Sequence, residues 1–567
     1  MFVKTTRVRR GNRTYEYLSL VEAVREGPRT GHRTLLRLGE VSALRSSGQL
    51  ERIVAALESH LERERVDVNA LVAEDAPAVG AVAAIAAVWQ RLGLDGWFAQ
   101  VGAERGAERL APACFAMVAN RLAGACSKRR LGEWTGAEVV MPAGWERPSL
   151  DQYYRALEAV AAAKDPTEAH LYGALCDLTN LDLRLVCYDL TSTFWEGSTR
   201  PSQRFPSRTF GYSRDHRPDR PQVVIGLLCT SDGIPIAHHV FAGNTADVST
   251  LPGVLDDLAA RFGVGRVCVV ADRGLISADN VEELTGRGFA HVLATRLHRD
   301  PTCAAALTQA ARDDAVWVAV EGTELSACET RVGGQRCVVV DSPQRHERDT
   351  LRTVELVART EAKLLALEQR VRDGRLSDPA KIGRAAQRIL GPSGVERLFE
   401  LDIAHGRFVF HYRDDAFAYE ALLAGRYVLA TSLSPAEAST AQIVRAYRQL
   451  IDVEHRFRVL KDFLHLRPVR HWTETRVRGH IAICVYAAIL EALITRALAT
   501  ADVRDPDLDD QHLTAQRALR ELDRVRAVTL TTTSRTIDLV TRRSPLQARI
   551  LRALDVDTTP WDRATIH

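Results

Sequence analysis

The chain has 567 residues, which is too many for one hydrophobic core and predicts two to four domains. Hydrophobic residues make up 46% and charged residues 26%, the proportions of an ordinary soluble globular protein. The net charge of +3 is the small difference between 75 basic and 72 acidic residues, so composition alone does not indicate a DNA-binding protein. Arginine far outnumbers lysine, which suits phosphate contacts and equally suits a GC-rich coding sequence.

The sequence lacks the usual signatures of export, membrane insertion and zinc binding. No apolar stretch follows the charged N-terminus, so no signal peptide is predicted. The ten cysteines form no CxxC pair and no Cys/His cluster, which predicts free thiols in a reduced cytosolic compartment. The longest apolar run, Ile481 to Leu490, is about half of a bilayer span and predicts a buried core helix. We therefore expect a cytoplasmic protein with no membrane partner.

The first third of the chain divides into a β-rich segment and a helical region. Residues 1–47 alternate as strands do, around a turn at Gly27-Pro28, with basic residues at the front. Residues 48–178 show mainly the apolar spacing of helices. This region contains a basic cluster of Lys128, Arg129 and Arg130, for which a DNA contact and a solvated surface are both open.

The pattern changes near residue 180. Three antiparallel strands are predicted first, followed by strand–helix–strand units whose strands are apolar throughout and therefore parallel and buried. This order is typical of the RNase H-like fold. The predicted strands have the sequences LRLVCYDLTSTFW, RPQVVIGLLCT, IPIAHHVFAG, RVCVVAD and HVLATR.

Residues 297–425 interrupt this alternation with short strands and a long charged helical stretch, and we expect an insertion outside the RNase H-like sheet. The core resumes with the strand GRYVLATS. The predicted domains are an N-terminal β-rich segment (1–47), a helical DNA-end-binding region (48–178), the first part of the core (179–296), the insertion (297–425), the second part of the core (426–500) and a C-terminal helical region (501–567).

A helix predicted from about 440 to 464 carries two parallel rows of side chains. The first row is apolar at strict spacing of three and four, so it must face a core; it consists of Ile443, Ala446, Leu450, Val453, Phe457, Leu460 and Leu464. The second row lies beside it and includes Tyr447, Ile451, Glu454, Arg458 and Lys461. Taken alone, that second row is equally a helix edge with a Glu-to-Arg ion pair.

Two acids at the ends of apolar runs favour a functional interpretation of the row that contains Glu454. Asp189 follows an apolar run within a predicted strand, and Asp272 ends the run from Val267 to Ala271. A carboxylate at the end of a buried parallel strand is costly unless a cation or partner accompanies it, and ligands of α/β sheets bind at that edge. A strand-exit turn with an Asx hydrogen bond is the alternative for Asp272.

Four long segments together resemble the DDE transposases of bacterial insertion sequences, in the branch with a Tyr-Arg-Glu-Lys signature and a core split by an insertion. The similarity extends over most of the chain. The four segments are YDLTSTFWEG, GYSRDHRPDRPQVVIGLLCTSDGIPIAHHVFAGNTAD, VVADRGLISADNVEEL and YRQLIDVEHRFRVLKDFLHLRPVRHWTETRVRGHI.

The resemblance implies a role for each matching residue. Asp189, Asp272 and Glu454 match the three catalytic, metal-binding acids. Tyr447 and Lys461 match the signature tyrosine and lysine, which meet DNA. The signature arginine should stand where this chain has Leu450 on the apolar row, so Arg448 or Arg458 takes that role. Trp317 in the insertion is either a residue that stacks on a displaced base or an anchor of a local core.

Three acids without histidine fit two Mg²⁺ ions, for which Mn²⁺ can substitute, better than zinc. Two such ions about 3.5–4 Å apart activate the nucleophile and stabilise the leaving oxygen of a phosphodiester. The resemblance also implies double-stranded DNA as partner, both terminal inverted repeats and target, a homodimer in the DNA complex, and a place at the bacterial nucleoid. Two alternatives are a related nuclease that does not rejoin DNA and an inactive descendant that only binds it.

Overall fold

The structure is a computed structural model that describes residues 1–26, 29–58, 60, 72–179, 185–196, 205–262, 268–271, 278–295, 300–508, 511–531, 536–561 and 565–566. The chain forms two compact units. Unit 1 comprises Met1–Asp75, Thr529–Leu539 and Ala564–His567, and unit 2 comprises Ala76–Val528 and Val540–Arg563.

Unit 1 is β-rich, as predicted for the N-terminus. Its first sheet is antiparallel in the order β1-β2-β3 and is followed by two short helices; the bounds are β1 Phe2–Arg10, β2 Arg13–Glu26, β3 Arg29–Glu40, α1 Val41–Ser46 and α2 Gln49–Glu58. A second sheet has the order β18-β17-β16-β4, with bounds β4 Val72–Asp75, β16 Ala527–Thr531, β17 Thr536–Val540 and β18 Thr565–Ile566. The C-terminal region was expected to be helical, but AVTLT and TIDLV are rich in β-branched residues and form strands there.

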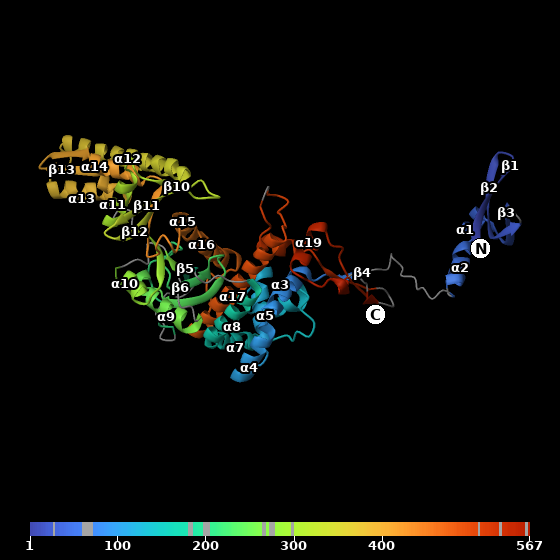
Figure 1. Ribbon diagram of the computed structural model, residues 1–567. Coiled ribbons are helices and arrows are strands. Elements are labelled where there is room, and N and C mark those ends of the chain that lie inside the picture. Colours follow the sequence, from blue (N-terminus) through green and yellow to red (C-terminus); the bar gives the residue numbers. More distant parts are fainter. Residues whose placement is uncertain are drawn as a thin grey trace. The chain divides into compact units, whose positions relative to one another are not determined.

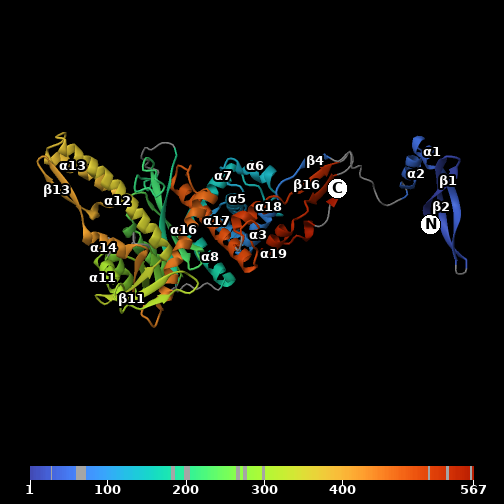
Figure 2. The same cartoon turned by 90° about the horizontal axis from the view of Figure 1, so that it is seen from above.

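Helices dominate the N-terminal part of unit 2, where they pack around one long apolar helix (Figure 2). The bounds are α3 Gly80–Arg91, α4 Leu94–Arg105, α5 Leu110–Ala123, α7 Leu150–Ala162, α8 Lys164–Thr179 and the central α17 Glu474–Thr500. Only α17 among the described helices is long and apolar enough to cross a membrane, and 83% of its most apolar window is buried inside the molecule. Gly479 allows α7 to approach α17 closely, because a Cβ there would lie 2.0 Å from the Leu157 carbonyl oxygen. The prediction of a buried core helix is confirmed.

A nine-stranded mixed sheet forms the centre of the rest of unit 2, with the order β10-β11-β12-β15-β9-β8-β5-β6-β7 (Figure 1). β5, β6 and β7 are antiparallel, and β8 and β9 run parallel to β5. The bounds are β5 Leu185–Phe194, β6 Gln222–Thr230, β7 Pro235–Ala242, α9 Leu251–Phe262, β8 Cys268–Ala271, α10 Ala278–Gly286 and β9 Ala290–Ala294. This arrangement confirms the predicted RNase H-like core with flanking helices.

The insertion is β-plus-helical as expected, but its first strands do not lie outside the main sheet. β12 pairs with β15, and β15 pairs with β9, so the prediction of a separate β portion is wrong. A strand pattern in the sequence predicts that a segment is extended, but it does not predict which strand will be its neighbour. Here β12 pairs with the edge of β15 that β9 leaves open. The bounds are α11 Pro301–Ala310, β10 Trp317–Ala319, β11 Ser326–Val332, β12 Gln335–Asp341 and β15 Arg426–Thr431.

The remaining part of the insertion lies outside the sheet and has its own hydrophobic core, centred on Leu364, Ile382 and Phe408. Figure 1 shows α12 and α13 side by side with the β13–β14 hairpin. The bounds are α12 Pro343–Arg372, α13 Pro379–Leu390, β13 Phe399–Ala404, β14 Arg407–Tyr412 and α14 Asp414–Leu423.

The helix predicted for residues 440–464 consists of three consecutive segments. They are α15 Thr440–Arg448, α16 Leu450–Arg458 and the π-helical turn η7 Val459–Phe463. Ser439 and Gln442 form a capping box at the start of α15. All seven apolar positions of the first row are buried, which confirms that row as the face that packs on the core.

Candidate active site

Asp189 lies in β5, against which α16 packs. Its side chain is half-buried, and its Oδ1 accepts a hydrogen bond from the Leu190 backbone N–H at 2.7 Å. The parallel register places Tyr188, the residue before Asp189, opposite Ala271, the last residue of β8. Asp272 follows Ala271 directly in the sequence and lies outside the described residues.

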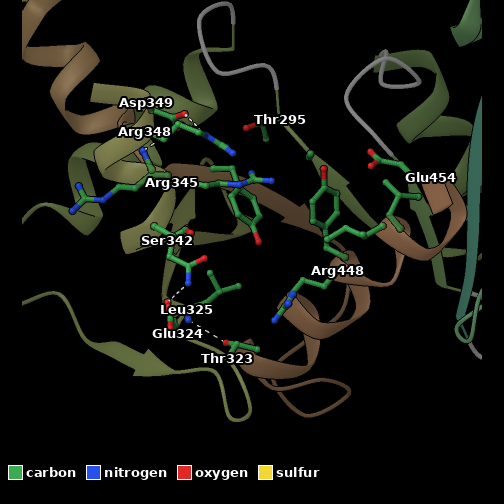
Figure 3. Close-up of a pocket in the computed structure, with 18 residues that line it drawn as sticks. Thr295, Thr323, Glu324, Leu325, Ser342, Arg345, Arg348, Asp349, Arg448 and Glu454 are labelled. Atoms are coloured by element: carbon green, nitrogen blue, oxygen red, sulfur yellow. Dashed lines mark hydrogen bonds and ion pairs between the residues drawn. The ribbon is translucent and has the colours of Figure 1, made fainter. Parts of the chain in front are cut away.

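Glu454 lies on α16 and lines a cavity of about 740 Å³ (Figure 3). The cavity opens at the edge of the sheet where β9 ends and β15 begins, because Ala294 and Arg426 both line it. Register connects this edge to β5, since Leu293 of β9 pairs with Ala271 of β8, which pairs with Tyr188. The end of β9 beside Glu454 is therefore level with Asp189 of β5, at an edge of the sheet where α/β proteins bind ligands.

Four arginines line this cavity, together with the acids Glu324, Asp349 and Glu454. Arg345 and Arg348 come from the first turns of α12, Arg426 starts β15, and Arg448 ends α15. Figure 3 shows Arg345 and Arg348 on one side of the cavity and Arg448 with Glu454 on the other. A cavity with guanidinium groups on facing walls suits a phosphate-bearing ligand, because guanidinium forks match phosphate oxygens.

The aromatic residues near the cavity have different positions. Tyr447 lines the cavity, and its ring lies 5.6 Å from the ring of Tyr427, which lines it as well. Trp317 is half-buried and packs against a small apolar cluster that includes Cys303 and Val339. The Arg426 guanidinium lies over the Trp317 indole at 5.5 Å. The Trp317 indole thus packs against the guanidinium of Arg426, one of the four arginines that line the cavity.

Lys461 does not point freely into solvent. Its ammonium Nζ lies 2.7 Å from Oδ1 of Asp215, and its side chain is only 11% exposed. Burial lowers the pKa of Lys461, whereas the contact with Asp215 raises it. Arg458, the last residue of α16, is exposed.

The basic cluster after α5 divides between the interior and the surface. Lys128 is buried, its Nζ has no hydrogen-bond partner in the described part of the chain, and burial lowers its pKa to about 7. Arg129 and Arg130 are exposed, and Arg130 forms an ion pair with Glu138 at 2.8 Å. Of the three residues of the cluster, only these two arginines are exposed.

Sequence reasoning missed Arg345, Arg348 and Arg426, which form much of the cavity wall. A charged helix and a strand start gave no signal that they face Glu454, because that contact depends on how the insertion folds back on the sheet. Asp215 was also missed, although it lies in the GYSRDHRPDR segment that carries part of the family resemblance. Within the described residues, which do not include Asp272, no group of three His, Cys, Asp or Glu side chains is placed to hold a metal ion.

Two family models match the chain. The model described as "Transposase DDE domain" matches residues 183–490, which is more than half of the chain, and "IS1634 family transposase, N-terminal domain" matches residues 2–70. The protein therefore belongs to the DDE transposases of insertion sequences. No curated protein matches it.

Proposed function

We propose that the protein cuts the ends of its insertion sequence and joins them to target DNA by metal-dependent phosphodiester hydrolysis and strand transfer. The proposed catalytic residues are Asp189, Asp272 and Glu454. The observation that carries this proposal is that Glu454 lines a cavity at the end of β9. The strand register places this end level with Ala271 of β8 and Tyr188 of β5, each of which is followed directly by an acid.

The donor set fits Mg²⁺ or Mn²⁺. Asp189 is half-buried beside a packed helix, and Glu454 is exposed toward the cavity, so both offer carboxylate oxygen, the ligand type that Mg²⁺ prefers. With Asp272, these residues would hold two ions. When bound, the ions activate the nucleophile and stabilise the leaving oxygen.

The surrounding residues bind and orient the DNA strand. Arg345, Arg348 and Arg448 meet the phosphates next to the scissile bond, because their guanidinium groups line the cavity that Glu454 enters. Tyr447 lies at the same wall. Lys461 contributes one phosphate contact farther along the helix.

The proposed partners are the terminal inverted repeats and the target, both double-stranded. Two ends must be held together, so the active form is a homodimer at the nucleoid in the cytoplasm. We further propose that residues 48–178 contact the element end through Arg129 and Arg130, and that residues 297–425 act as one functional insertion although their first strands belong to the main sheet.

A cleavage assay on linear DNA with the element's own ends and Mg²⁺ tests this proposal. Asp189→Asn and Glu454→Gln should each lower the cleavage rate by at least about 10³-fold without unfolding the protein. Asp452→Asn is the matched control, because Asp452 is an exposed acid on the same helix, two residues before Glu454. Cleavage that survives both substitutions would refute the assignment, and cleavage without any joined product would identify a nuclease.

The same proposal has a structural requirement. In a DNA-bound structure the carboxylates of Asp189, Asp272 and Glu454 should lie within about 10 Å of one another, because a two-metal centre cannot bridge more. A larger separation in an ordered complex would contradict the triad.

A further inference from the structure

Residues 213–215, which precede β6, are fixed to the sheet and to its neighbours by their own contacts. The Arg214 backbone N–H donates to Ser192 Oγ at 3.1 Å, and its guanidinium forms an ion pair with Asp247 at 2.6 Å. The Ser213 hydroxyl accepts a hydrogen bond from the Asp215 backbone N–H at 3.3 Å. The contacts of Ser213 and Arg214 therefore hold Asp215 in position independently of the Glu454 helix.

The carboxylate of Asp215 joins two cations from the end of that helix. The side chain of Asp215 is 3% exposed, and its Oδ1 accepts from Lys461 Nζ at 2.7 Å and also from the Arg467 guanidinium. Arg467 donates in addition to Asp462 at 2.9 Å. The second oxygen, Oδ2, is buried and has no hydrogen-bond partner in the described part of the molecule. One oxygen thus holds two positive charges side by side.

Asp215 forms ion pairs with two cations, whereas Lys461 has a single carboxylate as counter-charge in the described part of the chain. Asp215 is the one carboxylate among the described residues that forms an ion pair with Lys461. Burial lowers the pKa of Lys461, as do the cations of Arg467 and Arg214, whereas the contact with Asp215 raises it. Lys461 also lies within the π-helical turn η7, and such turns occur often at functional sites.

We propose that Asp215 is a positioning residue for the transposase reaction: it holds Lys461 and Arg467 together and charged so that both meet the DNA backbone beside the Glu454 site. This inference rests on the proposed DNA contact of Lys461. The carboxylate offsets the repulsion between the two cations, and the free donors of the ammonium and guanidinium groups then face a phosphate as a preformed pair.

The test measures binding of the full-length protein to a fluorescent random-sequence duplex, in metal-free buffer, as a function of pH. Asp215→Asn removes the charge that supports Lys461, whose neighbours are then the cations Arg467 and Arg214, themselves paired with Asp462 and Asp247. The pKa of Lys461 should fall, so affinity relative to wild type should drop by up to about tenfold as pH rises between about 6 and 9. At the low end of this range the variant should bind at least as tightly as wild type.

Two further variants separate positioning from a general structural effect. Asp215→Asn combined with Lys461→Arg should restore binding at high pH, because arginine stays charged throughout this range. Asp219→Asn is the matched control, since Asp219 is an exposed acid of the same loop that pairs with Arg217 and should change nothing. If Asp215→Asn fails to fold, Arg467→Gln gives a test of opposite sign, because losing a neighbouring cation should move the pH midpoint upward.

Each outcome decides the matter. If Lys461→Met binds as tightly as wild type, the proposed contact of Lys461 fails, and the inference fails with it. If Lys461→Met weakens binding but Asp215→Asn follows the wild-type pH profile, only the inference is overturned. Tighter binding of Asp215→Asn at every pH would show that Asp215 competes with the phosphate, and failure of Lys461→Arg to restore binding would contradict the role of charge.

Discussion

Glu168 and Asp215 are two buried carboxylates of unit 2 that differ in how many of their oxygens have a hydrogen-bond or ion-pair partner. Glu168 on α8 is 2% exposed, and both of its oxygens are occupied. Oε1 accepts from the His238 backbone N–H at 2.9 Å, and Oε2 lies 2.8 Å from Lys164 and 2.7 Å from Arg261. In Asp215 one oxygen carries both contacts with cations, and the other has no hydrogen-bond partner in the described part of the chain.

The difference shows how structure and function divide between buried charges. A buried carboxylate whose two oxygens are both occupied holds its elements in one arrangement, and here Glu168 fastens α8 to β7 and α9. A buried carboxylate oxygen left without a partner needs another explanation, and an adjacent functional site is one. Asp215, with one such oxygen, lies at the end of the Glu454 helix, whereas Glu168 joins elements that carry no proposed catalytic residue.

Glu168→Gln should give the largest effect on stability. It leaves Lys164 and Arg261 without their main buried counter-charge, and breaking such a pair costs about 3–5 kcal/mol of the free energy of unfolding. Urea denaturation measures this loss, and DNA affinity of the folded variant should be unchanged. Asp215→Asn should cost less, because in the described part of the chain only one oxygen of Asp215 accepts hydrogen bonds, whereas both oxygens of Glu168 are occupied. Equal losses would remove the contrast between the two clusters.

Leu450→Ala provides a measure of a purely structural effect on the helical stretch that carries Glu454 and Lys461. Leu450 is 5% exposed on the packed row, and truncating such a side chain costs about 2–5 kcal/mol. Thermal melts of Leu450→Ala and Lys461→Ala side by side check the assignment of the two rows. A similar fall in melting temperature for both variants would mean that the row with Glu454 also serves packing.

The stabilisation by Glu168 should depend on pH. Burial opposes ionisation of Glu168, but the contacts with His238 and Lys164 outweigh it and hold the pKa below the ordinary value of 4.5. A depressed pKa stabilises the folded state above the unfolded-state value and loses this effect as pH falls. The stability difference between wild type and Glu168→Gln should therefore be full at about pH 7 and should shrink steadily below about pH 4.5. A constant difference across this range would show that charge is not what stabilises the network.

The smallest effect is expected from Lys461→Ala at neutral pH. Loss of one phosphate contact should reduce the slope of log affinity against log salt by about one. Duplex binding at several salt concentrations measures the slope. Arg458 is exposed on the same row of the helix, and the salt slope of Arg458→Ala is measured alongside that of Lys461→Ala for comparison. An unchanged slope for Lys461→Ala would place Lys461 in the structural class with Glu168.

The fold could be predicted from the sequence where local patterns determine it. The apolar spacing of Ile443 to Leu464 and the run Ile481 to Leu490 gave the correct buried faces, because helical periodicity depends on neighbours in the chain. The alternation of strands and helices after residue 180 gave the core. The pairing of β12 with β15 could not be predicted, because it joins residues about 90 positions apart and strand patterns carry no partner information.

The candidate site divides in the same way. Glu454 was assigned from its helix row and the family resemblance, and the structure places it at a cavity. Arg345 reaches the same cavity only through the path of the insertion. The burial of Lys128 was equally invisible, since a basic cluster in sequence does not show which of its members turns inward. Contacts between distant segments determine both outcomes.

The way the insertion leaves and re-enters the sheet separates two parts of the site. Asp341 pairs with Arg426, so the chain from Ser342 to Gly425 leaves and returns at neighbouring positions of two antiparallel strands. In topological terms it is an enlarged hairpin loop, and a two-residue turn can make the same connection. Such an excursion can lengthen, shrink or be exchanged at little cost in loop-closure entropy while the nine strands keep their register. The cavity wall that carries Arg345 and Arg348 can therefore change in evolution while the strands that position Asp189 and Asp272 stay the same.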